Sequence, residues 1–210
     1  MMVPDLTFCG IYRNEANNVR RVLDIGSSLC EQMVIGVQKS DDDTLNICKE
    51  YPTAKVIEFS DKLAPEECRD EIISQVKTRW TFWLDADELP SIDLILMLEH
   101  ADLPISSDAI KFPRINYING KHIEANQGVD EQFRLIRSDV RWNPKQQGRR
   151  CHIYPLVKNP VSLPFPIYHH RTLEKIEATT KRWNELEPQT EYECNLYLTQ
   201  VKQRLKHVKP

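Results

Sequence analysis

Three carboxylates lie close together after a stretch of aromatic, strand-forming residues, "TRWTFWLDADELPS" (78–91). They are Asp85, Asp87 and Glu88. Two like charges 4 Å apart repel each other by about 1 kcal/mol in water and by several times more in a partly dry crevice. A fold that gathers such charges usually offsets them with a cation, and oxygen ligands in Asp-x-Asp spacing suit a hard ion such as Mg²⁺ or Mn²⁺. The simpler interpretation is that these acids only solvate the strand end and cap the next helix.

Alternation along an extended chain would place Asp85 and Asp87 on the same side of the strand. Ala86 would then point away, and its small side chain would leave space for a ligand. Both carboxylates could therefore face one ion or one bound molecule.

The elements that position these acids follow a regular order. Apolar runs at 6–12, 31–38, 54–60 and 80–88 alternate with helical patterns, so residues 1–88 read β-α-β-α-β-α-β. Near-continuous apolar strands predict a parallel sheet covered on both faces. Such sheets bind ligands at the carboxyl ends of their strands. The polar clusters Arg13–Glu15, Ser40–Asp43 and Asp85–Glu88 each follow a strand, so we expect three loops to converge on one crevice.

The second half of the chain has a different character. A helix is predicted over 91–101, followed by short extended pieces rich in proline and aromatic residues. Asn119-Gly120 is typical of a tight hairpin turn. From about residue 171, two amphipathic helices are predicted.

Composition excludes several classes of protein. The chain has 210 residues and a net charge of −3, which gives no reason to expect a nucleic-acid partner. Six scattered cysteines form no Cys-x-x-Cys pair, which favours reduced thiols over a zinc site or a disulfide framework. The N-terminal residues "MMVPDLTFCG" have neither the cationic start nor the apolar run expected of a secretory signal, and no stretch approaches the roughly 20 apolar residues of a membrane span. We expect a soluble, cytoplasmic protein, and leave open that further domains follow its C-terminus.

Four short motifs carry a resemblance to a known family. They are "IYRNEANNV" after the first strand, "SDDDT" after the second, "CRDEII" in the third helix and "FWLDADE" at the fourth strand. In order and spacing, the chain resembles the family 2 glycosyltransferases of GT-A fold. The resemblance implies an α/β, Rossmann-like, mostly parallel sheet flanked by helices, with a small mixed β region and C-terminal helices. It also implies a nucleotide-sugar-binding half (1–100), an acceptor-binding half (101–170) and a C-terminal helical segment (171–210).

The same resemblance implies a metal-dependent, inverting transfer. The donor would be a UDP-sugar carrying a glucose- or rhamnose-type hexose or deoxyhexose, and the acceptor a hydroxyl of a glycan or glycoprotein. Asp87 would ligate Mn²⁺ or Mg²⁺, Asp85 would hold a ribose hydroxyl and a water of the metal shell, and His169 would complete that shell. The remaining residues expected at the nucleotide-sugar are Gly10, Tyr12, Arg13, Glu15, Arg69 and Ala86.

One position departs from the family pattern. Where the second strand usually ends in an aspartate that reads uracil, this chain has Val37 with Gln38 beside it. The Gln38 amide could offer a donor and an acceptor to a uracil edge, or main-chain groups could read the base instead. No glycine-rich phosphate loop is present, which favours phosphate binding through a metal.

An inverting transferase needs a base for the acceptor hydroxyl. Asp130 is slightly favoured over Glu131, with Glu88 and Asp93 in reserve. His152 and His170 are further candidates for the metal shell beside His169. The arginines that could hold the diphosphate are Arg134, Arg137, Arg149 and Arg150, and the tryptophans that could stack on a sugar are Trp80, Trp83 and Trp142. A sugar-nucleotide nucleotidyltransferase, a metal-dependent nuclease or phosphatase, and a non-catalytic carbohydrate- or nucleotide-binding module remain open alternatives.

Overall fold

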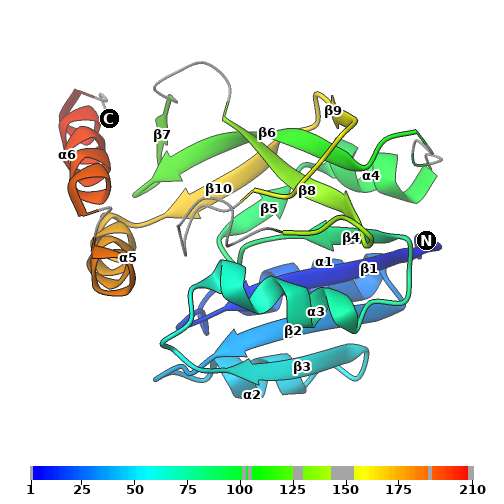
Figure 1. Cartoon of the computed structure of the whole chain (residues 1–210). Helices are drawn as coiled ribbons and strands as arrows, with labels where there is room; N and C mark the ends of the chain where they lie inside the picture. The colour runs from blue at the N-terminus through cyan, green and yellow to red at the C-terminus, as the bar shows by residue number, and fades with distance from the viewer. Residues whose placement is uncertain are drawn as a thin grey trace.

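The computed structural model describes residues 2–100, 103, 106–124, 130–142, 154–188 and 191–207. Its strands are β1 (Leu6–Tyr12), β2 (Gln32–Gln38), β3 (Ala54–Phe59), β4 (Trp80–Trp83), β5 (Glu88–Pro90), β6 (Ala109–Ile118), β7 (Lys121–Ile123), β8 (Glu131–Arg137), β9 (Pro160–Ser162) and β10 (Ile167–Arg171). Its α-helices are α1 (Val19–Leu29), α2 (Thr44–Lys49), α3 (Arg69–Ser74), α4 (Ile92–His100), α5 (Leu173–Leu186) and α6 (Glu191–His207). The strands form one sheet in the order β3-β2-β1-β4-β8-β6-β10-β5, with β7 and β9 paired to β6 (Figure 1).

The first four strands form the predicted parallel sheet. β1 pairs with β2 and β4, and β2 pairs with β3, all in parallel. Helices cover both faces (Figure 1). Beneath α1, Phe8 and Met33 pack so closely on Gly26 that a Cβ there would overlap both, while Ile72 of α3 packs on Gly36 on the opposite face. The apolar runs in the sequence therefore correspond to strands buried between two helical layers.

The second half adds the mixed strands. β8 is antiparallel to β4 and to β6, whereas β10 is parallel to β6. β6 and β7 form the predicted hairpin, with positive φ at Asn119 (50°) and Gly120 (75°). Two consecutive residues with positive φ match the type I′ turn for which Asn-Gly is favoured.

The sheet curls, and this curl positions the candidate site. Only residues 84–87 separate β4 from β5, yet the two strands lie four steps apart along the strand order. β5 pairs antiparallel with β10, and the backbone N–H of His170 donates to the carbonyl of Asp87 (2.8 Å). The turn after β4 is therefore attached to a strand more than 80 residues further along the chain.

The local geometry of the Asp-x-Asp motif differs from the expectation. β4 ends at Trp83, and Asp85–Glu88 form a turn closed by a hydrogen bond from Glu88 N–H to the Asp85 carbonyl (3.0 Å). Strand alternation consequently does not apply to Asp85 and Asp87. The chain turns here because β5 must leave the parallel sheet and join β10.

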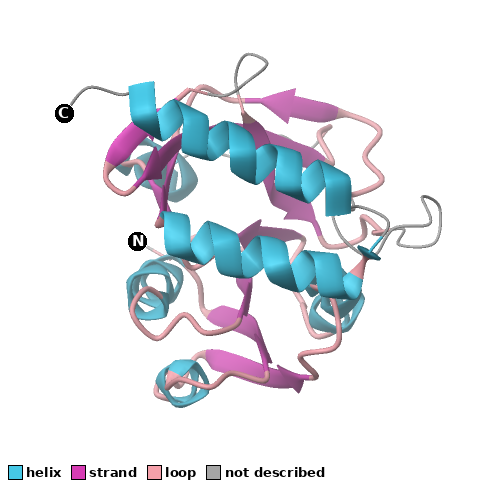
Figure 2. Ribbon diagram, turned by 90° about the vertical axis from the view of Figure 1, so that its left-hand side faces the viewer, coloured by secondary structure: helices cyan, strands magenta, loops and turns pink. Residues whose placement is uncertain are grey.

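The two C-terminal helices are present as predicted and run side by side (Figure 2). Thr172 caps the start of α5 by accepting a hydrogen bond from Lys175 N–H. A small apolar cluster that includes Ile118, Ile176 and Val201 joins these helices to β6 and β7. This packing brings the first turn of α5 to the end of the sheet where Asp87 lies.

Candidate active site

Asp87 lies at the centre of a group of basic side chains. His169 Nε2 is 3.4 Å from its Oδ1, whereas Lys175 Nζ (3.2 Å) and Arg171 Nε (3.7 Å) approach Oδ2. The Asp87 side chain is only 8% exposed. Burial raises the pKa of a carboxyl group, but the hydrogen bond and charge of His169, with Lys175 and Arg171, hold the pKa of Asp87 well below its ordinary value. These basic neighbours therefore favour the ionised form of Asp87.

Glu88 and Asp85 share a different cation. Arg134 Nη2 donates to Glu88 Oε1 (2.6 Å) and to Asp85 Oδ2 (2.8 Å). The Glu88 side chain is fully buried and also lies 3.4 Å from Arg114, so it serves as a structural counter-charge and cannot reach an acceptor. Half of the Asp85 side chain is exposed. Partial burial would raise its pKa, but the charge of Arg134 lowers it overall.

Asp130 is held by three donors. Its Oδ2 accepts from Arg114 Nε and Asn116 Nδ2, both at 2.9 Å, and its Oδ1 accepts from Gln132 Nε2 at 2.6 Å. Burial raises the pKa of Asp130, but the charge of Arg114 and these hydrogen bonds lower it overall. A carboxylate oxygen can accept two hydrogen bonds. Oδ1 therefore has capacity for one more donor, such as an acceptor hydroxyl.

Glu131 has a different environment. It is exposed at the start of β8 and accepts a hydrogen bond from Ser162 Oγ (3.1 Å). Asp93 is exposed in the first turn of α4, where a carboxylate stabilises a helix. Neither of these acids makes a contact with Asp87 or His169.

The loops after β1 and β2 are joined as predicted. Backbone N–H groups of Asn14 and Ala16 donate to the side chains of Ser40 and Asp42, and Glu15 N–H donates to Thr44 Oγ1 (2.7 Å). Within "SDDDT", Asp42 thus helps to hold the two loops together. Asp42 binds backbone groups rather than a ligand.

Glu15 connects these two loops to the first of the C-terminal helices. Its carboxylate forms a short ion pair with Lys175, the same side chain that approaches Asp87. The pKa of Glu15 is raised because burial outweighs the charge of Lys175. Arg13, which precedes it on the same loop, is half-buried.

Two residues expected at the nucleotide belong to the core. The ring of Tyr12 is 1% exposed and folds back under Gly10, where a Cβ would lie 2.1 Å from the tyrosine oxygen. Its hydroxyl donates to the Leu84 carbonyl (3.4 Å). Ala86 is also buried in this core cluster and leaves no space for a ligand. Gly10 and Tyr12 thus support the turn that carries Asp85 and Asp87.

Gln38 is also used within the protein. It is 1% exposed, its amide nitrogen donates to the Leu63 carbonyl (2.6 Å), and its amide oxygen accepts from Arg182 Nη2 of α5 (3.0 Å). Both halves of the amide that could have paired with uracil are therefore engaged. No local pattern identifies this partner, because Arg182 lies 144 residues away along the chain.

Arg69 stacks between two indole rings. Its guanidinium carbon lies 4.1 Å from the ring centre of Trp142 and 5.0 Å from that of Trp83. Both tryptophans are buried, as is Trp80 at the start of β4, so none of them offers a face to a sugar. Burial lowers the pKa of Arg69, although the charges of Glu66 and Asp85 oppose this.

His170 points away from the site. It is exposed, and its ring stacks on Tyr117 at 5.0 Å between ring centres. His152, Arg149 and Arg150 lie outside the described residues.

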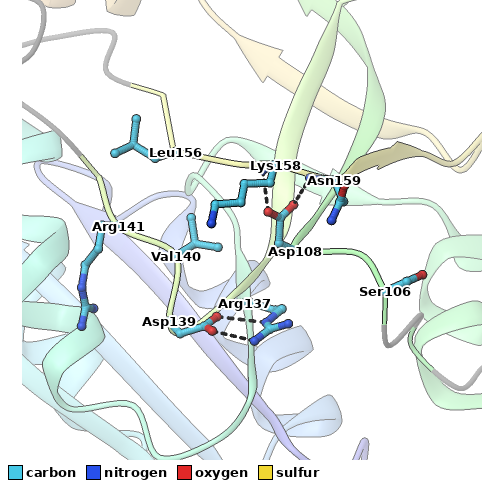
Figure 3. A pocket seen from close by; sticks show the side chains of 9 residues that line it. All are labelled: Ser106, Asp108, Arg137, Asp139, Val140, Arg141, Leu156, Lys158 and Asn159. Atoms are coloured by element: carbon cyan, nitrogen blue, oxygen red, sulfur yellow. Dashed lines mark hydrogen bonds and ion pairs between the residues drawn. The ribbon is translucent and has the colours of Figure 1, made fainter.

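A cavity lies at the C-terminal end of β8, away from Asp87. It has a volume of about 410 Å³ and is lined by Ser106, Asp108, Arg137, Asp139, Val140, Arg141, Leu156, Lys158 and Asn159 (Figure 3). Its acids are engaged locally: Asp139 pairs with Arg137, and Asp108 accepts backbone hydrogen bonds from Lys158 and Asn159. With a rise of about 3.3 Å per residue, β8 separates this cavity from Asp130 by roughly 20 Å.

Sequence reasoning missed several residues of the site. The structure adds Asn116, Arg114, Arg171 and Lys175, and it gives Arg134 a role in charge pairing. The basic residues could have been sought as counter-charges for the acids, but nothing local identified them. Within the described residues, no three acidic, histidine or cysteine side chains gather as a metal-binding group, and no helix is long and apolar enough to cross a membrane.

Comparisons with known proteins agree on the fold. The family described as "Glycosyl transferase family 2" matches residues 10–152. Among solved structures, S. aureus TarS 1–349 aligns with a TM-score of 0.55 at 12% identity, over 87% of this chain and 64% of that one. Its complex with UDP gives 0.55 at 12% over 89% and 65%, and its complex with UDP-GlcNAc 0.56 at 12% over 97% and 72%. The sequence matches no curated protein. The expected GT-A-like α/β fold is confirmed.

Proposed function

This chain belongs to glycosyl transferase family 2, and we propose that it transfers a sugar from a UDP-sugar to a glycan hydroxyl with inversion. The observation that carries the proposal is the pairing of Asp87 with His169 at the end of β4, where parallel sheets bind ligands. The TarS complexes with UDP and UDP-GlcNAc support a uridine diphosphate donor. For the sugar we propose a hexose or deoxyhexose, of glucose or rhamnose type.

Two of the side chains at this site, Asp87 and His169, carry atoms that could ligate a divalent cation. Its Oδ1 and His169 Nε2 are 3.4 Å apart, close to the roughly 3 Å between neighbouring ligands of an octahedral ion. We propose that Asp87 and His169 would hold Mn²⁺ or Mg²⁺, with Asp85 reaching a water of its shell or the ribose. When bound, such an ion supplies Lewis-acid stabilisation of the leaving diphosphate.

Lys175 and Arg171 would act on the same diphosphate. They contact Oδ2 of Asp87, whereas His169 contacts Oδ1. Both carry positive charge in a largely buried site, where electrostatic interactions are stronger than in water. We propose that they bind and orient the diphosphate and stabilise the charge that develops as it leaves.

Asp130 is the proposed base. Its free acceptor capacity on Oδ1 suits an incoming hydroxyl, and Arg114 and Asn116 fix the carboxylate through Oδ2. In the transfer, the acceptor oxygen bonds to the anomeric carbon, the bond from that carbon to the diphosphate breaks, and the hydroxyl proton passes to Asp130. Glu131 is the alternative, because it is more exposed at the start of β8.

Base recognition is proposed to use main-chain groups. Gln38 is engaged by Leu63 and Arg182, and Tyr12 is buried, so neither is included in the proposed site. Arg13 and Glu15 remain candidates on the loop after β1. Arg69 would influence the site only through its positive charge, which interacts with Asp85.

A non-catalytic binding module is the rival function. It is favoured by Lys175, which forms ion pairs with both Asp87 and Glu15. In that case Asp87 would be a structural ion-pair partner. Turnover distinguishes the two functions.

The test is release of UDP from UDP-glucose, UDP-rhamnose and UDP-GlcNAc, with Mn²⁺ or with EDTA. We expect slow metal-dependent hydrolysis of one donor, lost in Asp87→Asn and kept in Asp139→Asn, whose carboxylate pairs with Arg137 at the other end of β8. If the protein binds UDP but releases none from any of the three donors, with Mn²⁺ or with EDTA, the result supports the binding module instead.

A further inference from the structure

Four polar side chains form a continuous row across the site. Asp130 Oδ2 accepts from Asn116 Nδ2 (2.9 Å), Asn116 Oδ1 lies 2.8 Å from His169 Nδ1, and His169 Nε2 lies 3.4 Å from Asp87 Oδ1. Asn116 and His169 are direct partners in the pairing of β6 with β10. The row connects the proposed base to the proposed metal ligands.

The orientation of the Asn116 amide follows from Asp130. An ionised carboxylate can only accept hydrogen bonds, and the pKa of Asp130 is lowered, so Asp130 is ionised at neutral pH. The amide nitrogen must therefore face Asp130. This leaves the amide oxygen facing His169.

The tautomer of His169 follows in turn. An amide oxygen only accepts, so the nitrogen 2.8 Å from it, Nδ1, must carry the proton. In the neutral ring, Nε2 is then an unprotonated acceptor facing Oδ1 of Asp87. When Nε2 is also protonated, this contact is a hydrogen bond to Asp87, and in the neutral ring a cation between the two acceptors can take the place of that proton.

From this row we infer that Asn116 is a positioning residue that fixes His169 with Nε2 available to a divalent cation beside Asp87. The inference rests on the proposed function and deepens it. A histidine that ligates a metal normally donates its other ring N–H to such a partner, which sets its tautomer and orientation. The neighbouring His170 offers the contrast: its ring stacks on Tyr117 and has no such partner among the described residues.

The test compares Asn116→Leu and Asn116→Asp for binding of Mn²⁺, measured by the electron paramagnetic resonance of the free ion. Leucine removes the acceptor for Nδ1–H, and we expect Mn²⁺ affinity to fall about 10-fold or more. Aspartate keeps an acceptor toward His169 and should lose less. Gln132→Leu is the matched control, because it removes a donor from Asp130 and leaves the Asn116–His169 contact intact.

A packing role predicts the reverse order. Leucine matches asparagine in size, whereas Asn116→Asp places a second carboxylate beside Asp130, so aspartate would then be the more damaging change. Melting temperatures identify any variant that fails to fold. Nitrogen-15 NMR of the protein loaded with Mg²⁺ and UDP adds a direct readout: the wild-type His169 should carry its proton on Nδ1, and a proton on Nε2 would overturn the inference.

The outcomes also separate this inference from the proposed function. If the wild type turns over a UDP-sugar, and Asn116→Leu binds Mn²⁺ as tightly as the wild type does, the inference is wrong and the transferase stands. If the wild type turns over a UDP-sugar but binds no Mn²⁺, the same conclusion holds. If the wild type neither binds Mn²⁺ nor turns over any donor, both fail.

Discussion

The two halves of β8 differ in how their charged side chains are paired and how deeply these are buried. In its first half, Arg134 lies between Asp85 and Glu88, and Asp130, just before the strand, is bound by groups from β6 and β8. At its end, Arg137 pairs with Asp139 two residues away, with side chains 30% and 66% exposed. Surface pairs of the second kind cost little and contribute little. Burying charged groups costs free energy of folding. The densely charged first half of β8 is therefore the region for which a function is needed to explain that cost.

Replacing the proposed base should give the largest contrast between the two ends. Asp130→Asn removes the proton acceptor while keeping the shape, and we expect transfer to fall by about 10²- to 10⁴-fold. Asp139→Asn, at the other end of β8, should transfer at the wild-type rate. Initial rates with the donor identified above and a glycan acceptor measure both.

Glu131→Gln completes that experiment. It should leave the rate nearly unchanged if Asp130 is the base. A large loss in Glu131→Gln alone would transfer the role to Glu131.

The buried arginine should matter most for stability. Arg134→Met leaves Glu88 buried with only Arg114 beside it, and we expect a loss of about 3–5 kcal/mol in the free energy of unfolding. Arg137→Met breaks only the exposed pair and should unfold at nearly the same urea concentration as the wild type. Similar midpoints for the two variants would contradict the contrast drawn between the ends of β8.

Two lysines extend this comparison from stability to catalysis. Lys175→Met removes a positive charge next to Asp87 and Glu15, and we expect kcat/KM for the donor to fall about 10- to 100-fold. Lys158→Met, in the cavity of Figure 3, should leave it unchanged. An increase in Mn²⁺ affinity in Lys175→Met, without loss of turnover, would show instead that Lys175 competes with the ion.

Acid sensitivity should give the smallest effect. The pKa of Asp130 is lowered in the folded protein, so its contribution to stability is complete above the ordinary carboxyl pKa of about 3.9 and is lost as the pH falls below it. Urea unfolding at pH 7 and pH 3 should show a smaller acid-induced loss in Asp130→Asn than in the wild type. Asp139, whose pKa is lowered by Arg137, is mostly exposed, and Asp139→Asn should change this loss less.

Local patterns in the sequence were sufficient for much of the fold. Apolar runs located β1 to β4, and the Asn119-Gly120 turn and the two C-terminal helices followed from short-range chemistry. The Asp-x-Asp motif was located but described as strand, because nothing nearby shows that β5 leaves for β10. The segment Asp85–Glu88 is a turn because β5 pairs with β10, a strand about 80 residues further along the chain.

The site itself was predicted less completely for the same reason. Asp87 and His169 were both identified, but their contact depends on the curl of the sheet. Lys175, Arg182 and Asn116 carry no local signal, since an amphipathic helix or a mixed strand accommodates such residues anywhere on its polar face. Gln38 remains one of two candidates for reading uracil when the sequence is considered alone, because the arginine that engages it lies far away on α5.

Calorimetric titration of UDP into the wild type and Asp87→Asn, each with Mn²⁺ and with EDTA, shows whether Asp87 holds a metal ion that binds the diphosphate. We predict binding only by the wild type and only with Mn²⁺, because Asp87 and His169 together hold the ion that the diphosphate requires. Equal binding of UDP in all four titrations would contradict the account.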